Sequence, residues 1–150
     1  MTMVVVRGPQ EGEALVNPMG AKVLIRITGK ETGGSYAMIE GEQLPGSAPA
    51  PLHIHTFEDE AIHVLEGRLI VEIDGVEHSA LAGSYIFIPR GVAQRFWNPD
   101  DTICRYQSFF SPPGQEQYFR EAYSLDPKHP NYQADLASSR AKYGLRYPGK

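Results

Sequence analysis

Three side chains of types that bind metal ions lie close together in the sequence: His53, His55 and Glu60. On an extended strand, residues two apart point to the same face, which places the Cβ atoms of the two histidines roughly 7 Å apart. The polar residues 56–59 are long enough to reverse the chain, so we expect Glu60 to return on the next strand, opposite the histidines. Two imidazoles and a carboxylate around one point form a 2-His-1-carboxylate metal site, which leaves positions open for substrate or dioxygen.

Short β-strands must position these residues. The 15 glycines and 12 prolines fall between short β-prone runs, and Asp74-Gly75 between β-formers predicts a two-residue hairpin turn. Regular spacing of this kind predicts an antiparallel sandwich or barrel. The expected strands cover residues 4–7, 21–28, 35–42, 52–55, 60–66, 68–73, 76–80, 84–88, 93–98 and 102–110.

The pattern changes after Pro112-Pro113-Gly114. Apolar residues recur at helical spacing in 115–123 and in 132–143, with breaker residues 127–130 between them, which predicts two short helices. The 150 residues and 41% hydrophobic content suit one domain over residues 1–150. We divide it into N-terminal strands (1–34), the barrel with its motifs (35–110) and a helical C-terminal tail (111–150).

Composition excludes several function classes. The net charge of -4 is spread thinly over 18 acidic and 14 basic residues, so neither a nucleic-acid patch nor an anionic membrane partner is indicated. Cys104 is the only cysteine, which rules out an intramolecular disulfide and favours a buried structural thiol. The apolar runs are too short to span a bilayer, and no secretory signal is visible. We expect a cytoplasmic protein whose partner is a small molecule.

A second run of spaced residues completes the pattern. In residues 83–98 these are Gly83, Pro89, Gly91 and Asn98. Together with His53, His55, Glu60 and Gly67, they make the chain resemble the two motifs of the cupin superfamily over about residues 35–110. The chain is most similar to small single-domain cupins of the quercetin-dioxygenase-like group. The resemblance implies an all-β fold, the double-stranded β-helix or jelly-roll-like barrel, with short C-terminal helices.

The resemblance also implies a divalent metal ion (Fe, Mn, Ni or Zn) held by His53, His55 and Glu60. The fourth ligand in the family is a histidine, and here that place is taken by Gln94, whose amide oxygen is a poorer donor than imidazole. Three roles stay open for Gln94: an inner-shell ligand, a hydrogen-bond donor to substrate, or the mark of a weakened site. Glu60 is the candidate catalytic base.

Strand alternation predicts the pocket. If Gln94 faces inward, Phe96 shares its face, which makes Phe96 a candidate pocket wall; the same parity from Glu60 places His63 outside. Tyr36 and Met38, on a barrel strand, are further candidates for the substrate pocket.

Three functions are consistent with the resemblance. The leading hypothesis is a metal-dependent, dioxygenase-like enzyme acting on an oxygen-rich substrate of keto-enol, polyketide or flavonoid type. The alternatives are a metal-dependent isomerase, cyclase or lyase and a non-catalytic small-molecule binder. Gln94 in place of the histidine favours the isomerase, cyclase or lyase over the dioxygenase. The resemblance further implies a homodimer that covers an open sheet edge.

Overall fold

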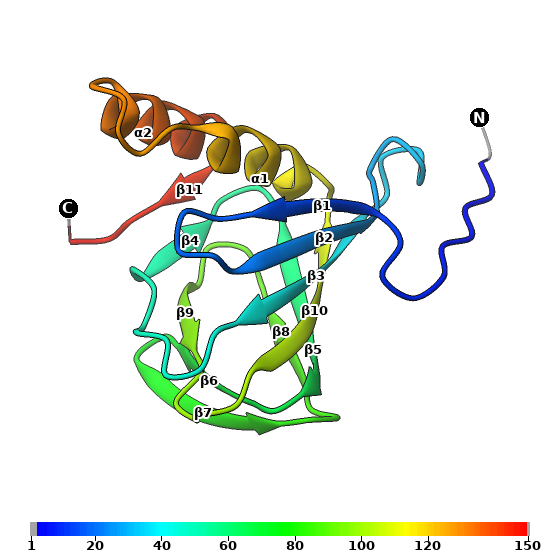
Figure 1. Cartoon of the computed structure of the whole chain (residues 1–150), viewed down its shortest axis with the longest axis vertical. Coiled ribbons are helices and arrows are strands. Elements are labelled where there is room, and N and C mark those ends of the chain that lie inside the picture. The colour runs from blue at the N-terminus through cyan, green and yellow to red at the C-terminus, as the bar shows by residue number, and fades with distance from the viewer. Residues whose placement is uncertain (1–2, 150) are drawn as a thin grey trace.

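The strands form two antiparallel sheets that face each other, as the computed structural model of residues 3–149 shows (Figure 1). The larger sheet has the order β1 (Glu13–Val16), β2 (Lys22–Ile27), β3 (Ala37–Gln43), β10 (Cys104–Ser111), β5 (Asp59–Glu66) and β8 (Tyr85–Ile88). The smaller sheet has the order β11 (Leu145–Arg146), β4 (His53–His55), β9 (Ala93–Trp97), β6 (Arg68–Ile73) and β7 (Val76–Leu81). This architecture confirms the predicted all-β fold with short C-terminal helices.

The interior is built by alternation along the strands. Ile62 and Val64 on β5 are 1% and 0% exposed, whereas His63 between them lies on the outer face and stacks on Tyr85. Leu69 and Val71 on β6 face them from the other sheet and are equally buried. Cys104 lies in this core, and burial raises the pKa of its thiol to about 11, which confirms a buried structural cysteine.

Local turn chemistry explains two of the connections. Asp74 and Gly75 both have positive φ, 49° and 81°, and join β6 to β7 as the predicted two-residue hairpin. Gly67, between β5 and β6, has a φ of 77°. A Cβ atom there would lie 2.8 Å from the carbonyl oxygen of Ile103, so the close approach to β10 requires glycine.

The predicted strand at residues 4–7 is wrong. Val4 and Val6 are 86% and 88% exposed, and this segment pairs with no strand of the described part. The first strand is instead β1, which pairs with β2 and was not predicted; β11 was also missed. Strand propensity depends on a neighbouring strand, and residues 4–7 have none.

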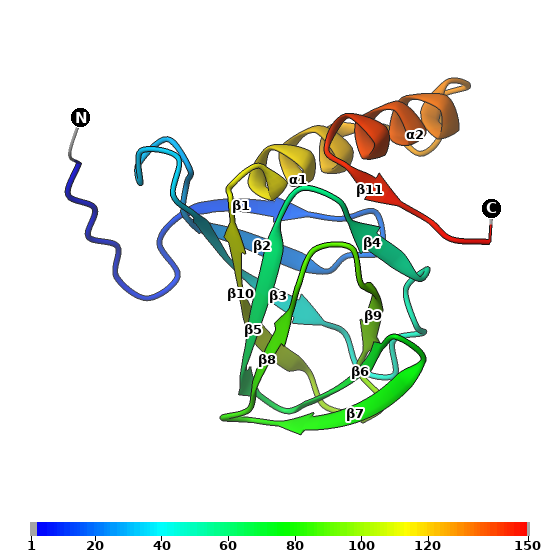
Figure 2. The same cartoon turned by 180° about the vertical axis from the view of Figure 1, so that it is seen from behind.

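The two predicted helices are present as α1 (Gln115–Ser124) and α2 (Tyr132–Lys142). They lie across the end of the barrel beside β4 and β1, and β11 returns from α2 to pair with β4 (Figures 1 and 2). Tyr118, Ala122 and Leu145 form a second small core there. The helical tail therefore covers the end of the barrel at which β4 lies.

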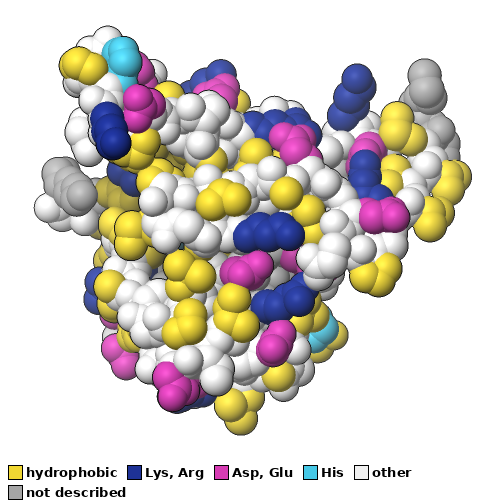
Figure 3. All heavy atoms as spheres, viewed as in Figure 1, with side chains coloured by type: hydrophobic (Ala, Val, Ile, Leu, Met, Phe, Trp, Pro, Cys, Tyr) yellow, Lys and Arg dark blue, Asp and Glu magenta, His cyan; other side chains and the backbone are white. Residues whose placement is uncertain are grey.

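On the face drawn in Figure 3, acidic and basic side chains are interspersed, and charges of one sign form no large patch. Within residues 3–149, neither helix has the length and apolar character needed to cross a membrane.

Candidate active site

The residues expected to form the site come from both sheets and meet inside the barrel. His53 and His55 lie on β4, and Gln94 lies directly opposite His53 on the neighbouring strand β9. Glu60 lies on β5, which pairs with β8 and β10 in the other sheet. β5 is the next strand after β4, as expected, but the two strands belong to different sheets and do not pair. Residues 56–58 carry the chain from one sheet to the other, so Glu60 faces the histidines across the interior.

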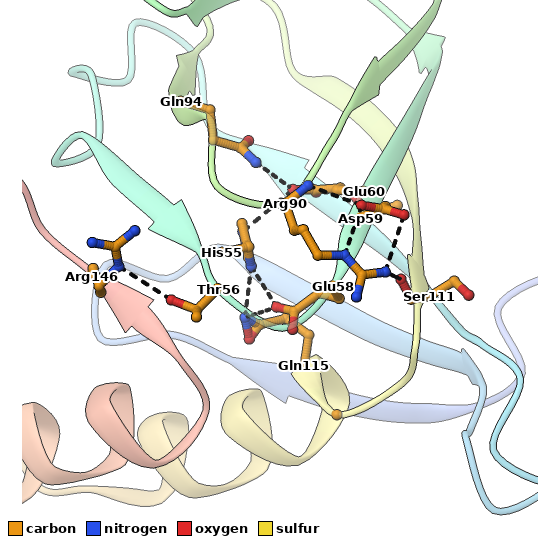
Figure 4. Close-up of polar contacts among 12 residues, drawn as sticks. His55, Thr56, Glu58, Asp59, Glu60, Arg90, Gln94, Ser111, Gln115 and Arg146 are labelled. Atoms are coloured by element: carbon orange, nitrogen blue, oxygen red, sulfur yellow. Dashed lines mark hydrogen bonds and ion pairs between the residues drawn. The ribbon is translucent and has the colours of Figure 1, made fainter.

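His55 is held between two buried carboxylates (Figure 4). Its Nδ1 lies 2.6 Å from Oε1 of Glu58, and its Nε2 lies 3.5 Å from Oε1 of Glu60. All three side chains are nearly inaccessible, with 6%, 3% and 3% exposure. An ionised carboxylate only accepts hydrogen bonds, so Nδ1–H donates to Glu58 and Nε2 is directed towards Glu60.

These contacts decide the proton affinity of His55. Burial lowers its pKa, but the hydrogen bond to Glu58 and the negative charges of Glu60 and Glu58 outweigh burial. The pKa of His55 therefore lies above its ordinary value.

Glu60 is fixed by two donors. Nε2 of Gln94 donates to its Oε1 at 3.1 Å, and Oγ of Ser108 donates to its Oε2 at 2.8 Å. Burial raises the pKa of Glu60 above its ordinary value, although His55 and both donors act in the opposite direction. A buried carboxylate with a raised pKa has the character of a general base or acid.

His53 has a different environment. Its Nδ1 donates to the carbonyl oxygen of Pro51 at 3.1 Å, and its ring lies edge-on to His55 with 5.1 Å between centroids. Burial and the charge of His55 lower the pKa of His53 to about 4, so its imidazole is neutral near pH 7.

The donor types of these residues suit a divalent cation. Gln94 adds a buried amide oxygen, Oε1, for which the structure records no hydrogen-bond partner. In the described part of the chain, however, no three His, Cys, Asp or Glu side chains are arranged as a metal-binding group. The types of these side chains therefore fit a metal ion. In the structure itself, however, the carboxylate of Glu60 is hydrogen-bonded to Gln94 and Ser108.

A cavity of about 440 Å³ opens onto His53, His55 and Glu60. Its size lies within the range of small-molecule sites, roughly 300–1,000 Å³. Much of its wall is aromatic, with contributions from the barrel and from the helical tail. These side chains are Phe96, Tyr106, Phe110, Tyr118, Phe119, Tyr123, Tyr132 and Tyr147.

The three residues expected in the pocket have separate locations. Phe96 lines the cavity and packs edge-on against Tyr106. Tyr36 stacks on Phe109 and lines a different hollow at the surface. On β3 the cavity residues are Ile39 and Gln43, and Met38 has the opposite strand parity.

Sequence reasoning missed three residues of the site: Glu58, Ser108 and Gln115. Glu58 was treated as part of a turn, although an acidic residue three positions after His55 was a usable signal. Ser108 shares strand parity with the inward-facing Phe110, which is a weaker signal. Gln115, the first residue of α1, donates from Nε2 to Glu58 at 3.4 Å, and only the docking of the tail reveals it (Figure 4).

Comparisons with known proteins agree with this fold. The family model described as "Cupin domain" matches residues 41–110, so the chain contains a cupin domain, which confirms the predicted superfamily. A crystal structure of a predicted oxalate decarboxylase from Thermotoga maritima has a TM-score of 0.63 and 20% identity. The match covers 73% of this chain and 99% of the Thermotoga chain. At this level of identity it supports the fold alone.

Two curated relatives share part of the chain. A "Polyketide synthase CurC" of Streptomyces cyaneus is 35% identical over 60 residues, and a "Protein SchB" of Streptomyces halstedii is 32% identical over 60 residues. Each match covers 40% of this chain, and they cover 39% and 44% of the respective relatives. The chain thus matches less than half the length of either relative.

Proposed function

We propose that this protein is an enzyme that transfers a proton within an oxygen-rich small molecule of keto-enol or polyketide type, as an isomerase, cyclase or lyase. The observation that carries the proposal is the buried row Glu58, His55 and Glu60, which ends on the aromatic cavity. The name of one relative, a polyketide synthase, supports the choice of substrate class.

In the proposed reaction, Glu60 accepts a proton from the carbon next to a substrate carbonyl. Its raised pKa makes the carboxylate a stronger base than an exposed glutamate, and Gln94 and Ser108 hold it in place. His55 donates from Nδ1 to Glu58, so its Nε2 faces Glu60 and the cavity, where it would hold the metal ion that polarises the substrate oxygen. Glu60 then returns the proton at a different carbon, which completes an isomerisation. In a ring closure the enolate carbon bonds instead to a second carbonyl carbon of the substrate, and Glu60 returns the proton to the oxygen of that carbonyl.

Metal dependence is part of the proposal. The residues that would hold a divalent ion are His53, His55 and Glu60, with the free amide oxygen of Gln94 nearby. A bound ion would supply polarisation of the substrate oxygen, and its identity among Fe, Mn, Ni and Zn is to be determined by metal analysis.

The test is exchange of substrate C–H protons with D2O, because this step precedes any product. We expect the wild-type protein to accelerate exchange at C2 of aromatic ketones such as 1-tetralone, and Glu60→Gln to reduce the rate by about 100-fold or more. Glu66→Gln, on the same strand but exposed, is the matched control and should exchange as wild type does. Equal rates for the wild type and Glu60→Gln would refute the assignment of the base.

A dioxygenase of the quercetin-dioxygenase-like type is the second candidate. It is favoured by the presence of two histidines and a carboxylate among the residues that line one cavity. Oxygen uptake by iron-loaded protein with flavonols tests it, and absence of uptake across such substrates excludes it. A protein that binds these compounds without exchange or uptake would be the non-catalytic binder.

We also propose a homodimer. The edge strand β8 exposes Tyr85 and Phe87 at 77% and 64%, and an edge with apolar side chains favours covering by a second copy. Light scattering that gives the mass of one chain would refute the dimer.

A further inference from the structure

Among residues 3–149, Arg140 on α2 is the only lysine or arginine that lines the cavity. Its Nε is buried and has no hydrogen-bond partner. The carbon at the centre of its guanidinium group lies 4.4 Å from the centroid of the Tyr147 ring. The contact with Tyr147 orients the guanidinium group, but an aromatic face leaves its N–H donors free.

Arg95 also has a buried Nε without a partner, but it bonds to Glu72 through another guanidinium nitrogen, and Arg140 has no such second contact. Among the described residues, each arginine other than Arg140 donates to a recorded hydrogen bond or forms an ion pair, and no such contact is recorded for Arg140. These others are Arg7, Arg26, Arg68, Arg90, Arg95, Arg105, Arg120 and Arg146. Arg140 is partly buried, and its buried Nε is removed from water without a hydrogen-bond partner, which costs free energy; in a cavity such a group points to a ligand.

Arg140 is connected through Tyr147 to the end of the cavity at which His53 lies. The Tyr147 ring contacts Arg140 on one side and lies 6.2 Å from the His53 ring, between centroids. Glu60 is the only acidic residue that lines the cavity, and it is already paired with Gln94 and Ser108. An anion held by Arg140 would therefore meet a free guanidinium group and aromatic walls.

We propose that Arg140 is the specificity-determining residue of this cavity and binds the carboxylate of an aromatic carboxylic acid. A guanidinium group matches a carboxylate through two parallel hydrogen bonds, and a planar ring fits between tyrosine and phenylalanine side chains of the tail. The carboxylate lies at Arg140, the ring lies along Tyr118 and Phe119, and the reacting oxygen extends towards His55. This inference rests on the proposed function, since it names the substrate class of that reaction. The binding of the carboxylate by Arg140 can be tested without the reaction.

The experiment compares 2-naphthoate with its neutral analogue 2-naphthamide by isothermal titration calorimetry. We expect wild-type protein to bind the acid about 10-fold or more tightly than the amide, since hydrogen bonds to charged groups contribute about 1.5–3 kcal/mol. Arg140→Gln should remove this preference by weakening the binding of the acid and leaving the binding of the amide unchanged. Arg140→Lys should keep part of the preference. Arg146→Gln, an exposed arginine on β11, is the control and should bind as wild type does.

The proposal is overturned if wild-type protein shows no preference for the acid, if it binds neither compound, or if Arg140→Gln keeps the preference. The binding result is independent of the proton-transfer assay. If Arg140→Gln loses the acid preference but wild-type protein catalyses no proton exchange, the carboxylate site stands and the proposed reaction fails.

Discussion

At the scale of single residues, the role of His55 depends on what each ring nitrogen contacts. Glu58 accepts a hydrogen bond from Nδ1, which makes Nδ1 the protonated nitrogen. The Nε2 atom then faces Glu60 and the cavity. The same histidine without Glu58 would be free to adopt either tautomer. Glu58 is therefore a positioning residue for the proposed chemistry.

Glu58→Gln tests this role. The amide of glutamine can donate to Nδ1, which would shift the proton of the neutral ring to Nε2, the nitrogen through which His55 would hold the metal ion. We expect the proton-exchange rate to fall about 10- to 100-fold, by analogy with other carboxylates that orient a functional histidine. Nitrogen-15 NMR of the imidazole should report the change of tautomer.

Asp59→Asn is the control for Glu58→Gln. Asp59 is the next residue but pairs with Arg90, away from His55 (Figure 4). Its replacement should leave the tautomer and the rate unchanged. A Glu58→Gln protein with the wild-type tautomer would contradict the positioning role.

At the scale of elements, the site depends on how the helical tail is joined to the barrel. Glu116 in the first turn of α1 is 2% exposed, and its two oxygens accept hydrogen bonds from the backbone N–H of Gly29 and of Gly114, both at 2.7 Å. One carboxylate thus connects the start of α1 to the loop after β2. The cavity walls supplied by the tail depend on this connection.

Glu116→Ala should destabilise the protein by about 2–4 kcal/mol. The substitution leaves the buried N–H of Gly29 and the partly buried N–H of Gly114 without their acceptor, and an unsatisfied buried group costs about 1–3 kcal/mol. Urea denaturation followed by circular dichroism measures the loss. Gln117→Ala, the exposed neighbour on the same helix, should change stability by no more than about 0.5 kcal/mol, and an equal effect of both substitutions would contradict the anchoring role.

At the scale of the whole molecule, the N-terminal segment is joined to the barrel by charge and not by a strand. Arg7 donates to both carboxylate oxygens of Glu31 and to the carbonyl oxygen of Arg26. The hydrogen bond from Arg7 lowers the pKa of Glu31 from 4.5 to about 2, against the opposing effect of burial. The folded state therefore holds Glu31 ionised in a range where the unfolded chain protonates it.

This shift predicts a pH-dependent contribution to stability. Because the pKa of Glu31 is lower in the folded state, the contribution is full above about pH 4.5 and is lost as the pH falls towards about 2. Glu31→Gln should destabilise the protein by about 1 kcal/mol at pH 7, since partial exposure screens the pair, and by progressively less on acidification. Urea midpoints at pH 7, 4 and 3 measure the convergence, and a cost that does not shrink with acid would argue against the ion pair.

Glu77→Gln is the control for this pH series. Glu77 is exposed on β7, and no ion pair is recorded for it within residues 3–149. Its replacement should have a small effect at every pH in the series.

The sequence by itself determined the strand-rich architecture from residue 21 onwards, the hairpin at Asp74-Gly75 and the two short helices. These features depend on local signals: alternation of side chains, residues that tolerate positive φ, and apolar spacing. It also identified His53, His55, Glu60 and Gln94 as one group, because their spacing matches two recurring motifs.

Only the tertiary structure decided which sheet each of these residues belongs to and what completes the site. Glu60 faces the histidines from the opposite sheet, Gln94 and Ser108 bind it, and Gln115 and Arg140 arrive from a tail far along the chain. Residues 4–7 have strand composition and no strand partner. Contacts between residues distant in sequence depend on how the two sheets and the tail pack, and no local pattern specifies that packing.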